Sequence, residues 1–323
     1  MKNDNLSAPL ITIGITCFNA RDTIKRAIES AINQDWPNIE ILIVDDCSTD
    51  GSIELIEIIK KKHPIISFIK HAVNKGPAGA RQTIIDNANG KFIAFFDDDD
   101  KSMPERCSIQ FQHLKSYEEK TGVKLLACYA SGQRIYSNGY TLQINAIGSQ
   151  NIPPKGYEIA DYLLFYGKKK NVFYGAGVPT CALMARKETF IEIGGFDKNF
   201  RRVEDVDFAI RLGLAGGHFI GCTEHLYIQY STQAQDKSPE KNLENEIQLA
   251  EKYKDYLRSV GRYEYAKRWP FIRYHHFAGN HLKMLNALIR LFLHCPIKTL
   301  SHFMKTAPRR LLHEIKMKKA AQK

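Results

Sequence analysis

Apolar and polar residues alternate in blocks along the first hundred positions of the chain. Four short apolar runs have the length and composition of buried strands, at residues 10–16, 39–44, 65–69 and 92–96. Between them, apolar residues recur at helical spacing in the segments 24–31, 53–59 and 80–88. Strand and helix alternate four times, which predicts parallel βαβ units. The expected fold is therefore α/β, an open sheet with helices on both faces.

The pattern is weaker after residue 106. We expect helices at 109–120 and 205–215, strands at 125–130, 180–185, 219–220 and 226–230, and an irregular segment at 138–170. From Glu240 onward the pattern is helical, with breaks near Gly261, Pro296 and Pro308. The polar stretch 231–239 is loop-like, so we place a domain boundary there. The predicted domains are residues 1–236 and a helical region at 237–323.

Four consecutive aspartates, Asp97 to Asp100, directly follow the fourth apolar run. Carboxylates at the end of a buried strand repel one another and resist desolvation, so folding disfavours the cluster unless a positive group binds there. A divalent cation that shares these oxygens with phosphates is the simplest partner. A solvated acidic loop and a calcium loop are the alternatives. The segment Lys101–Pro104 lacks the alternating acidic positions and the Gly that a calcium loop needs.

A second acidic pair, Asp45 and Asp46, ends the second predicted strand. Ligands of open α/β sheets bind beyond the carboxyl ends of the strands. We therefore expect both groups of aspartates to share one crevice.

Composition narrows the class of protein. No apolar run approaches the roughly 18 to 20 residues that span a bilayer, and residues 1–9 are short and polar, without a signal-peptide core. The 7 cysteines are odd in number and widely spaced, and no CxxC occurs. This favours reduced thiols in a cytoplasmic protein over a disulfide framework or a zinc site.

Six motifs occur in series along the chain: 13–19 (IGITCFN), 44–51 (VDDCSTDG), 74–76 with 80–81 (NKG, AR), 96–100 (FDDDD), 194–197 (GGFD) and 204–205 (ED). With these motifs the chain resembles the family 2 glycosyltransferases of the GT-A fold, which build bacterial capsule, lipopolysaccharide and related surface glycans. The resemblance covers residues 9–230. It implies a Rossmann-like, open mixed sheet with a C-terminal helical extension.

The resemblance also implies a reaction. A hexose or N-acetylhexosamine would pass from a UDP-sugar to an acceptor hydroxyl with inversion, assisted by Mn²⁺ or Mg²⁺. Asp99 and Asp97 match the metal-binding motif, with Asp97 and Asp98 nearer the ribose. Every position of the motif is Asp here, so this division of labour is ambiguous.

Other positions match the donor site and the catalytic base. Asp46 matches the carboxylate that accepts a hydrogen bond from the uracil imide, and the backbone at Thr16–Asn19 would line the base pocket. The positions assigned to nucleotide-sugar binding are Thr16, Phe18, Asn19, Asp46, Lys75, Arg81, Asp97 and Asp98. For Arg81 a structural salt bridge is the alternative to contact with the diphosphate.

Asp205 matches the general base, and Glu204 would orient the acceptor or tune Asp205. The alternative is that both acids only favour a helix N-terminus through its dipole. The chain departs from the family in one respect. Many relatives carry a His in the loop after the last strand, where this chain offers Asp236 and Lys237.

Charge is concentrated at the end of the chain. Residues 262–323 carry 14 Lys and Arg against 2 acidic residues, a net +12, whereas residues 1–261 carry 32 against 33, a net −1. The basic residues alternate with aliphatic and aromatic ones at helical spacing, as at Leu282, Leu285, Ile289 and Phe292. This composition is typical of a helix on an anionic membrane surface, here the inner face of the cytoplasmic membrane. A helical cap on the catalytic domain and a homo-oligomer contact are the alternatives.

The expected partners are a nucleotide sugar and a glycan or lipid-linked oligosaccharide acceptor. A sugar nucleotidyltransferase would need a Gly-rich loop with Arg and Lys near the first strand, which Cys17–Ala20 does not supply. Transfer to polyprenyl phosphate itself is disfavoured because no spanning helix is predicted. A nucleic-acid-binding role is disfavoured because residues 1–261 are nearly neutral, the predicted crevice is acidic, and no recognised nucleic-acid-binding motif occurs.

Overall fold

The structure is a computed structural model that describes residues 8–231 and 238–320. The chain divides into two compact units. The first comprises Met1–Ile135, Leu142–Ala160 and Lys169–Tyr230, and the second comprises Tyr136–Thr141, Asp161–Lys168 and Ser231–Lys323. The domain boundary predicted between 236 and 237 lies outside the described residues.

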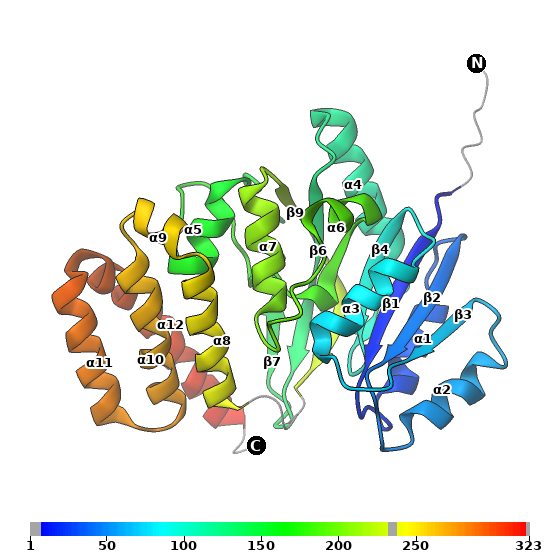
Figure 1. Cartoon of the computed structure of the whole chain (residues 1–323), viewed down its shortest axis with the longest axis horizontal. Coiled ribbons are helices and arrows are strands. Elements are labelled where there is room, and N and C mark those ends of the chain that lie inside the picture. The colour runs from blue at the N-terminus through cyan, green and yellow to red at the C-terminus, as the bar shows by residue number, and fades with distance from the viewer. Residues whose placement is uncertain (1–7, 232–237, 321–323) are drawn as a thin grey trace. The chain divides into compact units, whose positions relative to one another are not determined.

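The described residues form a nine-stranded sheet, most of which belongs to the first unit (Figure 1). Its strands are β1 (Ile11–Cys17), β2 (Ile39–Asp45), β3 (Ile66–Lys70), β4 (Phe92–Asp97), β5 (Lys101–Ser102), β6 (Leu126–Ile135), β7 (Thr141–Ile144), β8 (Leu183–Arg186) and β9 (His218–Tyr230). The strand order is β3-β2-β1-β4-β8-β6-β9-β5, with β7 paired to β6. Strands β1 to β4 are parallel, and β8 is antiparallel to β4 and β6. The predicted open mixed sheet is confirmed.

Three helices join the parallel strands: α1 (Ile24–Ile32), α2 (Ser52–Lys60) and α3 (Gly76–Asn87). The chain runs outward from β1 to β3 and then returns past them to β4. Because such crossovers are right-handed, α1 and α2 lie on one face and α3 on the other. Helix α3 packs so closely that a Cβ on Gly14 of β1 would come within 2.5 Å of the Ile84 side chain.

Helix α3 begins four residues earlier than the pattern predicted. Gly76 adopts φ 76°, a conformation that costs glycine little, and Pro77 occupies the first turn, where its missing N–H is not needed. Residues 76–79, which precede the predicted helical segment 80–88, therefore belong to α3.

The second half of the sheet carries α4 (Arg106–Thr121), α6 (Lys187–Ile193) and α7 (Glu204–Leu214). The prediction of an irregular segment at 138–170 was wrong, because β7 and α5 (Tyr157–Phe165) form there. The strand predicted at 180–185 begins as a 3₁₀ turn at Thr180–Ala182 before β8. The two strands predicted at 219–220 and 226–230 are one strand, β9, whose pairing with β6 shifts register near Ser131. Short polar interruptions at such irregularities resemble loops in the sequence.

Helices make up most of the second unit: α8 (Pro239–Lys252), α9 (Lys254–Ser259), α10 (Tyr263–Phe277), α11 (His281–His294) and α12 (Pro296–Ala320). The break predicted at Pro308 was wrong, because α12 continues through it. Proline removes one hydrogen bond and bends a helix without necessarily ending it. Across residues 8–231 and 238–320, no helix is both long enough and apolar enough to span a bilayer.

Candidate functional site

Three parallel strands end side by side at one edge of the sheet. Cys17 of β1 lies opposite Asp45 of β2, and Thr16 lies opposite Asp97 of β4. The segments that follow these strands therefore emerge together, as expected from the sequence. Their polar side chains and backbone groups form a candidate site.

Asp46 is buried and tightly held at the end of β2. One carboxylate oxygen accepts hydrogen bonds from the backbone N–H of Lys75 at 2.8 Å and pairs with Nδ1 of His71 at 2.7 Å. The other accepts from the backbone N–H of Gly76 at 2.7 Å. Asp46 thus joins β2 to the loop that opens α3, and His71, which also contacts Thr83 Oγ1 at 2.9 Å, fixes it from behind.

The loop after β1 is fixed from two sides. The backbone N–H of Phe18 donates to Asp98 Oδ2 at 3.0 Å, and that of Asn19 donates to Ser48 Oγ at 2.8 Å. Asn19 has φ 49°, which asparagine tolerates better than most residues. The Phe18 ring is left about half exposed beside the strand ends. Asp45 holds the neighbouring turn by accepting the N–H of Ser48 at 2.9 Å.

The aspartates after β4 are crowded: Asp100 is buried, and Asp97, Asp98 and Asp99 are partly exposed. Burial, reinforced by the other aspartates, raises the pKa of Asp98 to about 8 and that of Asp100 to about 8. Burial also raises the pKa of Asp97, against the opposing effect of Arg81. A site that holds its carboxylates partly protonated at neutral pH is poised to exchange those protons for a cation.

The residues present fit a divalent metal. Ligand atoms of Asp97, Asp100 and Cys181 all lie within 4.8 Å of one another. Oδ2 of Asp100 is buried without a hydrogen-bond partner, although its Oδ1 accepts the N–H of Tyr230 at 3.2 Å. Carboxylate oxygens are the donors that Mg²⁺ and Mn²⁺ prefer. The backbone oxygen of Asp99 accepts a hydrogen bond from Arg26, which further shapes this turn.

Arg81 connects the aspartates to α7. Its guanidinium bonds to Glu204, and Nη2 lies 3.6 Å from Asp97 Oδ1. All three side chains are at least partly buried, and Arg81 is almost completely so. The salt bridge considered for Arg81 is therefore present, and it places the start of α7 against the end of β4.

Helix α7 begins with a strained turn that presents Asp205. Val203 adopts φ 60°, an unusual conformation for a β-branched residue. Asp205 Oδ1 accepts the backbone N–H of its neighbour Val206 at 2.7 Å. Burial, followed by the charge of Glu204, raises the pKa of Asp205 to about 7. Asp207, in contrast, is completely buried and bonds Arg211 at 2.8 Å, a structural role.

Most residues assigned from the sequence lie around this edge of the sheet: Thr16, Phe18, Asn19, Asp46, Arg81, Asp97, Asp98, Asp99, Glu204 and Asp205. Lys75 contributes its backbone N–H to Asp46, and its side chain is exposed. Asp236 and Lys237 lie outside the described residues. Sequence reasoning missed His71 and Cys181. The position of His71 directly after β3, one residue beyond the pair Asp45–Lys70, is a signal that could have found it.

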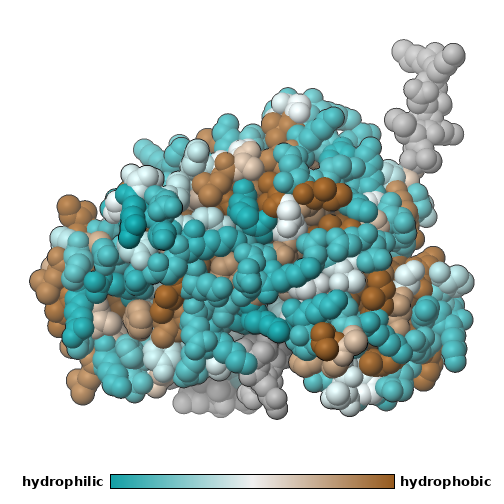
Figure 2. Space-filling view, viewed as in Figure 1, coloured by the Kyte–Doolittle hydropathy of each residue, from teal (hydrophilic) through white to brown (hydrophobic). Residues whose placement is uncertain are grey.

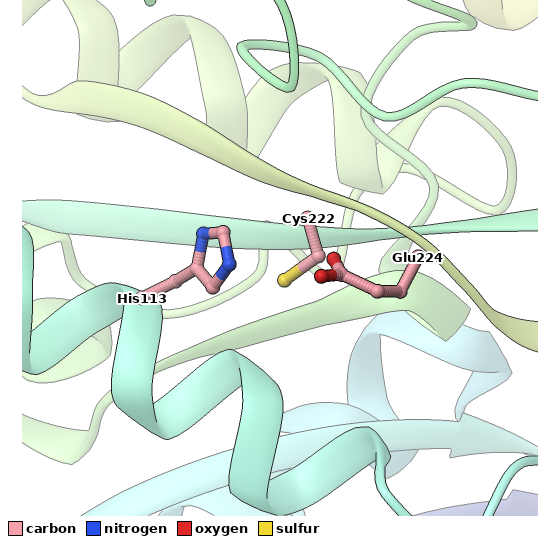
Figure 3. A group of neighbouring side chains, drawn as sticks. All are labelled: His113, Cys222 and Glu224. Atoms are coloured by element: carbon pink, nitrogen blue, oxygen red, sulfur yellow. The ribbon is translucent and has the colours of Figure 1, made fainter.

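A second group of ligand-type side chains lies away from this site (Figure 3). His113 of α4 and Cys222 and Glu224 of β9 bring their ligand atoms within 4.8 Å of one another. The Cys222 thiol already contacts that of Cys128 at 3.8 Å, and Glu224 is exposed. We assign no function to this group.

The sequence is similar to those of known proteins. The family model described as "Glycosyl transferase family 2" matches residues 12–186. The chain is 40% identical over 107 residues to the Escherichia coli protein named UDP-Glc:alpha-D-GlcNAc-diphosphoundecaprenol beta-1,3-glucosyltransferase WfaP, a match that covers 33% of this chain and 42% of WfaP. It is 29% identical over 246 residues to the putative colanic acid biosynthesis glycosyl transferase WcaA of Escherichia coli K12, covering 75% and 79%. The match thus spans about two fifths of WfaP.

Among solved structures, S. aureus TarS 1-349 in complex with UDP-GlcNAc superposes with a TM-score of 0.60 at 15% identity, covering 90% of this chain and 82% of that one. At this identity the likeness establishes the fold. The sequence matches identify the class of protein, a glycosyltransferase. The family match over more than half of the sequence makes the assignment specific: the chain belongs to glycosyl transferase family 2.

Proposed function

We propose that the protein is an inverting, metal-dependent glycosyltransferase of bacterial surface polysaccharide synthesis. It moves a hexose or N-acetylhexosamine from a UDP-sugar to an acceptor hydroxyl. The observation that carries the proposal is the link through Arg81, which joins the aspartates of β4 to the Glu204–Asp205 pair of α7. A cation-binding group and a carboxylate with a pKa of about 7 thus belong to one electrostatic network.

The donor half of the site follows from the strand ends. Backbone groups at Thr16, Phe18 and Asn19, with Asp46 behind them, offer a pocket edge for the base, and Asp98 lies nearest to them through its bond with Phe18. Asp46 already accepts three hydrogen bonds, so its second oxygen has one acceptor position left for a base N–H. Lys75 and Arg81 supply positive charge for the diphosphate.

The metal would be held by Asp97 and Asp99, with Asp100 and Cys181 adjacent to Asp97. When bound, Mn²⁺ or Mg²⁺ supplies Lewis-acid neutralisation of the charge that develops on the departing diphosphate.

Asp205 performs the proton transfer. The acceptor oxygen attacks the anomeric carbon, the bond to the diphosphate oxygen breaks, and the hydroxyl proton passes to the carboxylate of Asp205. A base with a pKa near the working pH is well matched to this task. Glu204 keeps that pKa high and is itself held by Arg81, so it acts as a positioning residue.

The acceptor is a lipid-linked glycan in this proposal. The name of WfaP describes transfer to a diphosphoundecaprenol-linked sugar. An enzyme using such an acceptor works at a membrane, and residues 262–323 supply the basic, apolar composition for it. We place the protein in the cytoplasm, peripheral at the inner face of the cytoplasmic membrane.

The test is donor hydrolysis by the purified full chain. With Mn²⁺ present, UDP-, GDP-, CMP- and dTDP-sugars are supplied singly, and nucleotide release is measured beside Asp99→Asn and Asp205→Asn. Asp86→Asn, which alters an exposed carboxylate of α3, is the matched control. We expect metal-dependent release from one UDP-sugar, lost in Asp99→Asn and retained in Asp86→Asn. No release from any UDP-sugar, with no UDP binding by calorimetry, would overturn the proposal.

A further inference from the structure

Helix α11 exposes a narrow stripe of large apolar side chains. Its members are Leu282, Leu285, Ile289, Phe292 and Leu293. At about 100° per residue they fall within an arc of roughly 100°. Leu291, the buried residue of this helix, lies on the opposite side. The helix therefore packs by one face and turns a second apolar face to solvent, where Leu282 is 85% exposed.

Helix α12 repeats this arrangement. Five of its exposed apolar residues, Ile297, Leu300, Met304, Leu311 and Ile315, fall within an arc of roughly 60°, and the exposed Phe303 and Leu312 lie on either side of that arc. Thr299 and His302 are buried and lie away from that arc, and His302 packs against the Trp269 ring with centroids 4.1 Å apart. Both helices thus have one side packed against the protein and another, apolar side exposed to solvent.

These stripes are too concentrated to be incidental surface residues. Single exposed apolar residues are normal, whereas contiguous apolar patches mark interaction surfaces. Figure 2 shows apolar residues gathered along the edge where α11 lies in Figure 1. Something other than water is expected to cover them.

The positive charge beside the apolar stripes indicates which partner covers them. Residues 281–320 contain nine Lys and Arg but one acidic residue, Glu314. Lys283 and Arg290 lie on one flank of the α11 stripe, and Lys305 and Lys316 lie on the corresponding flank of the α12 stripe. All four are exposed, and none forms an ion pair within the described part of the chain. A second copy would bring like charges together, whereas an anionic bilayer offers both an apolar interior and negative headgroups.

We propose that α11 and α12 are a lipid-docking surface for anionic bilayers, with the stripe residues inserted at the headgroup boundary and the flanking Lys and Arg on the lipid phosphates. This rests on the proposed function and deepens it, because within the basic region it assigns the membrane contact to two helices and their exposed apolar stripes. The surface binds lipid whether or not the enzyme has a donor or an acceptor.

The test is sedimentation of the full chain with vesicles of phosphatidylcholine alone or with phosphatidylglycerol added. Four variants are compared with the parent. Leu282→Glu/Leu293→Glu alters the α11 stripe, Ile297→Glu/Met304→Glu alters the α12 stripe, and Lys283→Gln/Arg290→Gln alters the flank. Val73→Glu/Ile191→Glu is the matched control, because it changes two similarly exposed apolar residues of the first unit. Circular dichroism checks that each variant folds.

We expect the parent to bind anionic vesicles at least about tenfold more tightly than neutral ones, and less tightly as salt is raised. Each stripe variant should lose about tenfold or more in affinity, the flank variant should lose its preference for anionic lipid, and the control should match the parent. Failure of the parent to bind anionic vesicles would overturn the proposal. So would equal losses in the control, or concentration-dependent dimers by light scattering that the stripe variants abolish. Because no sugar nucleotide is present, these outcomes are independent of the hydrolysis assay.

Discussion

His71 and Asp46 are bonded side chain to side chain, Nδ1 to Oδ1 at 2.7 Å, and both are almost completely buried. They come from different loops, 25 positions apart, and together they fix the end of β2 against the start of α3. In the proposed donor site, the pair holds the carboxylate that would face the base. Disturbing it should therefore affect both folding and nucleotide binding.

His71→Ala should lower the free energy of unfolding by about 1–3 kcal/mol, because it leaves a buried carboxylate oxygen short of a partner. The affinity for UDP should fall as well, since Asp46 is no longer held. Urea denaturation and calorimetry measure the two effects. His225→Ala, at an exposed histidine of β9, is the control and should change neither. A His71→Ala protein as stable as the parent would show that Asp46 is held adequately by the backbone alone.

Arg81→Met should be the most destabilising single change in the site. The substitution leaves Glu204 and Asp97 without their positive partner. Breaking a buried ion pair in this way typically lowers the free energy of unfolding by about 3–5 kcal/mol. Arg81→Met/Glu204→Met should recover part of the loss, because the second substitution removes one stranded charge. Chemical denaturation of the four proteins in this double-mutant cycle gives the coupling. If the two single losses of stability simply add in the double variant, Arg81 and Glu204 do not interact.

The exposed pair Lys115–Glu119 is the control, and its disruption should leave the free energy of unfolding unchanged.

The rate should depend on pH through Asp205. Its pKa is raised to about 7, and only the ionised carboxylate can accept a proton, so kcat/KM should fall about tenfold per pH unit below 7. Glu204→Gln removes the neighbouring negative charge and should shift this limb to lower pH. The pH–rate profiles of the parent and of Glu204→Gln measure the effect. A limb that does not move would place the titrating group elsewhere.

The metal-free protein should lose stability as pH rises from about 4 to 8. Asp98 and Asp100 stay protonated to about pH 8 in the folded chain but ionise near 3.8 when unfolded. The unfolded state therefore binds fewer protons in this window, and the stabilisation present below pH 4 is lost as pH approaches 8. Melting temperatures with EDTA at pH 6 and pH 8 test the trend. Adding Mn²⁺ should raise the melting temperature more at pH 8, where fewer protons compete for the carboxylates. A larger metal effect at pH 6 would argue against carboxylate ligands.

The sequence predicts the first half of the sheet well because the apolar runs that form β1 to β4 are short, uninterrupted and separated by helical periodicity. It locates the two aspartate groups for the same reason, since parallel strands end at one edge. The roles of individual site residues remain predictions. Prediction fails from 138 to 170, where β7 and α5 are short and their apolar residues show no clear period.

Contacts that depend on tertiary packing could not be read from the chain. Cys181 lies near the aspartates because β8 runs antiparallel beside β4. The residues around Cys181 in the sequence do not indicate the direction of that strand. The bond between Arg81 and Glu204 joins residues 123 positions apart, and only the folded chain brings them together. His71 is the exception, because the register of β2 and β3 would have placed it beside Asp46.

The left-handed turn at Val203 has a consequence for how this enzyme could change. A β-branched residue held at φ 60° costs on the order of 1–3 kcal/mol, and glycine would occupy the same turn with little strain. A chain with glycine there would gain local freedom at the point from which Asp205 is presented. In the proposed mechanism, relieving the strain at Val203 and holding Asp205 in place as the base are therefore opposed at one residue.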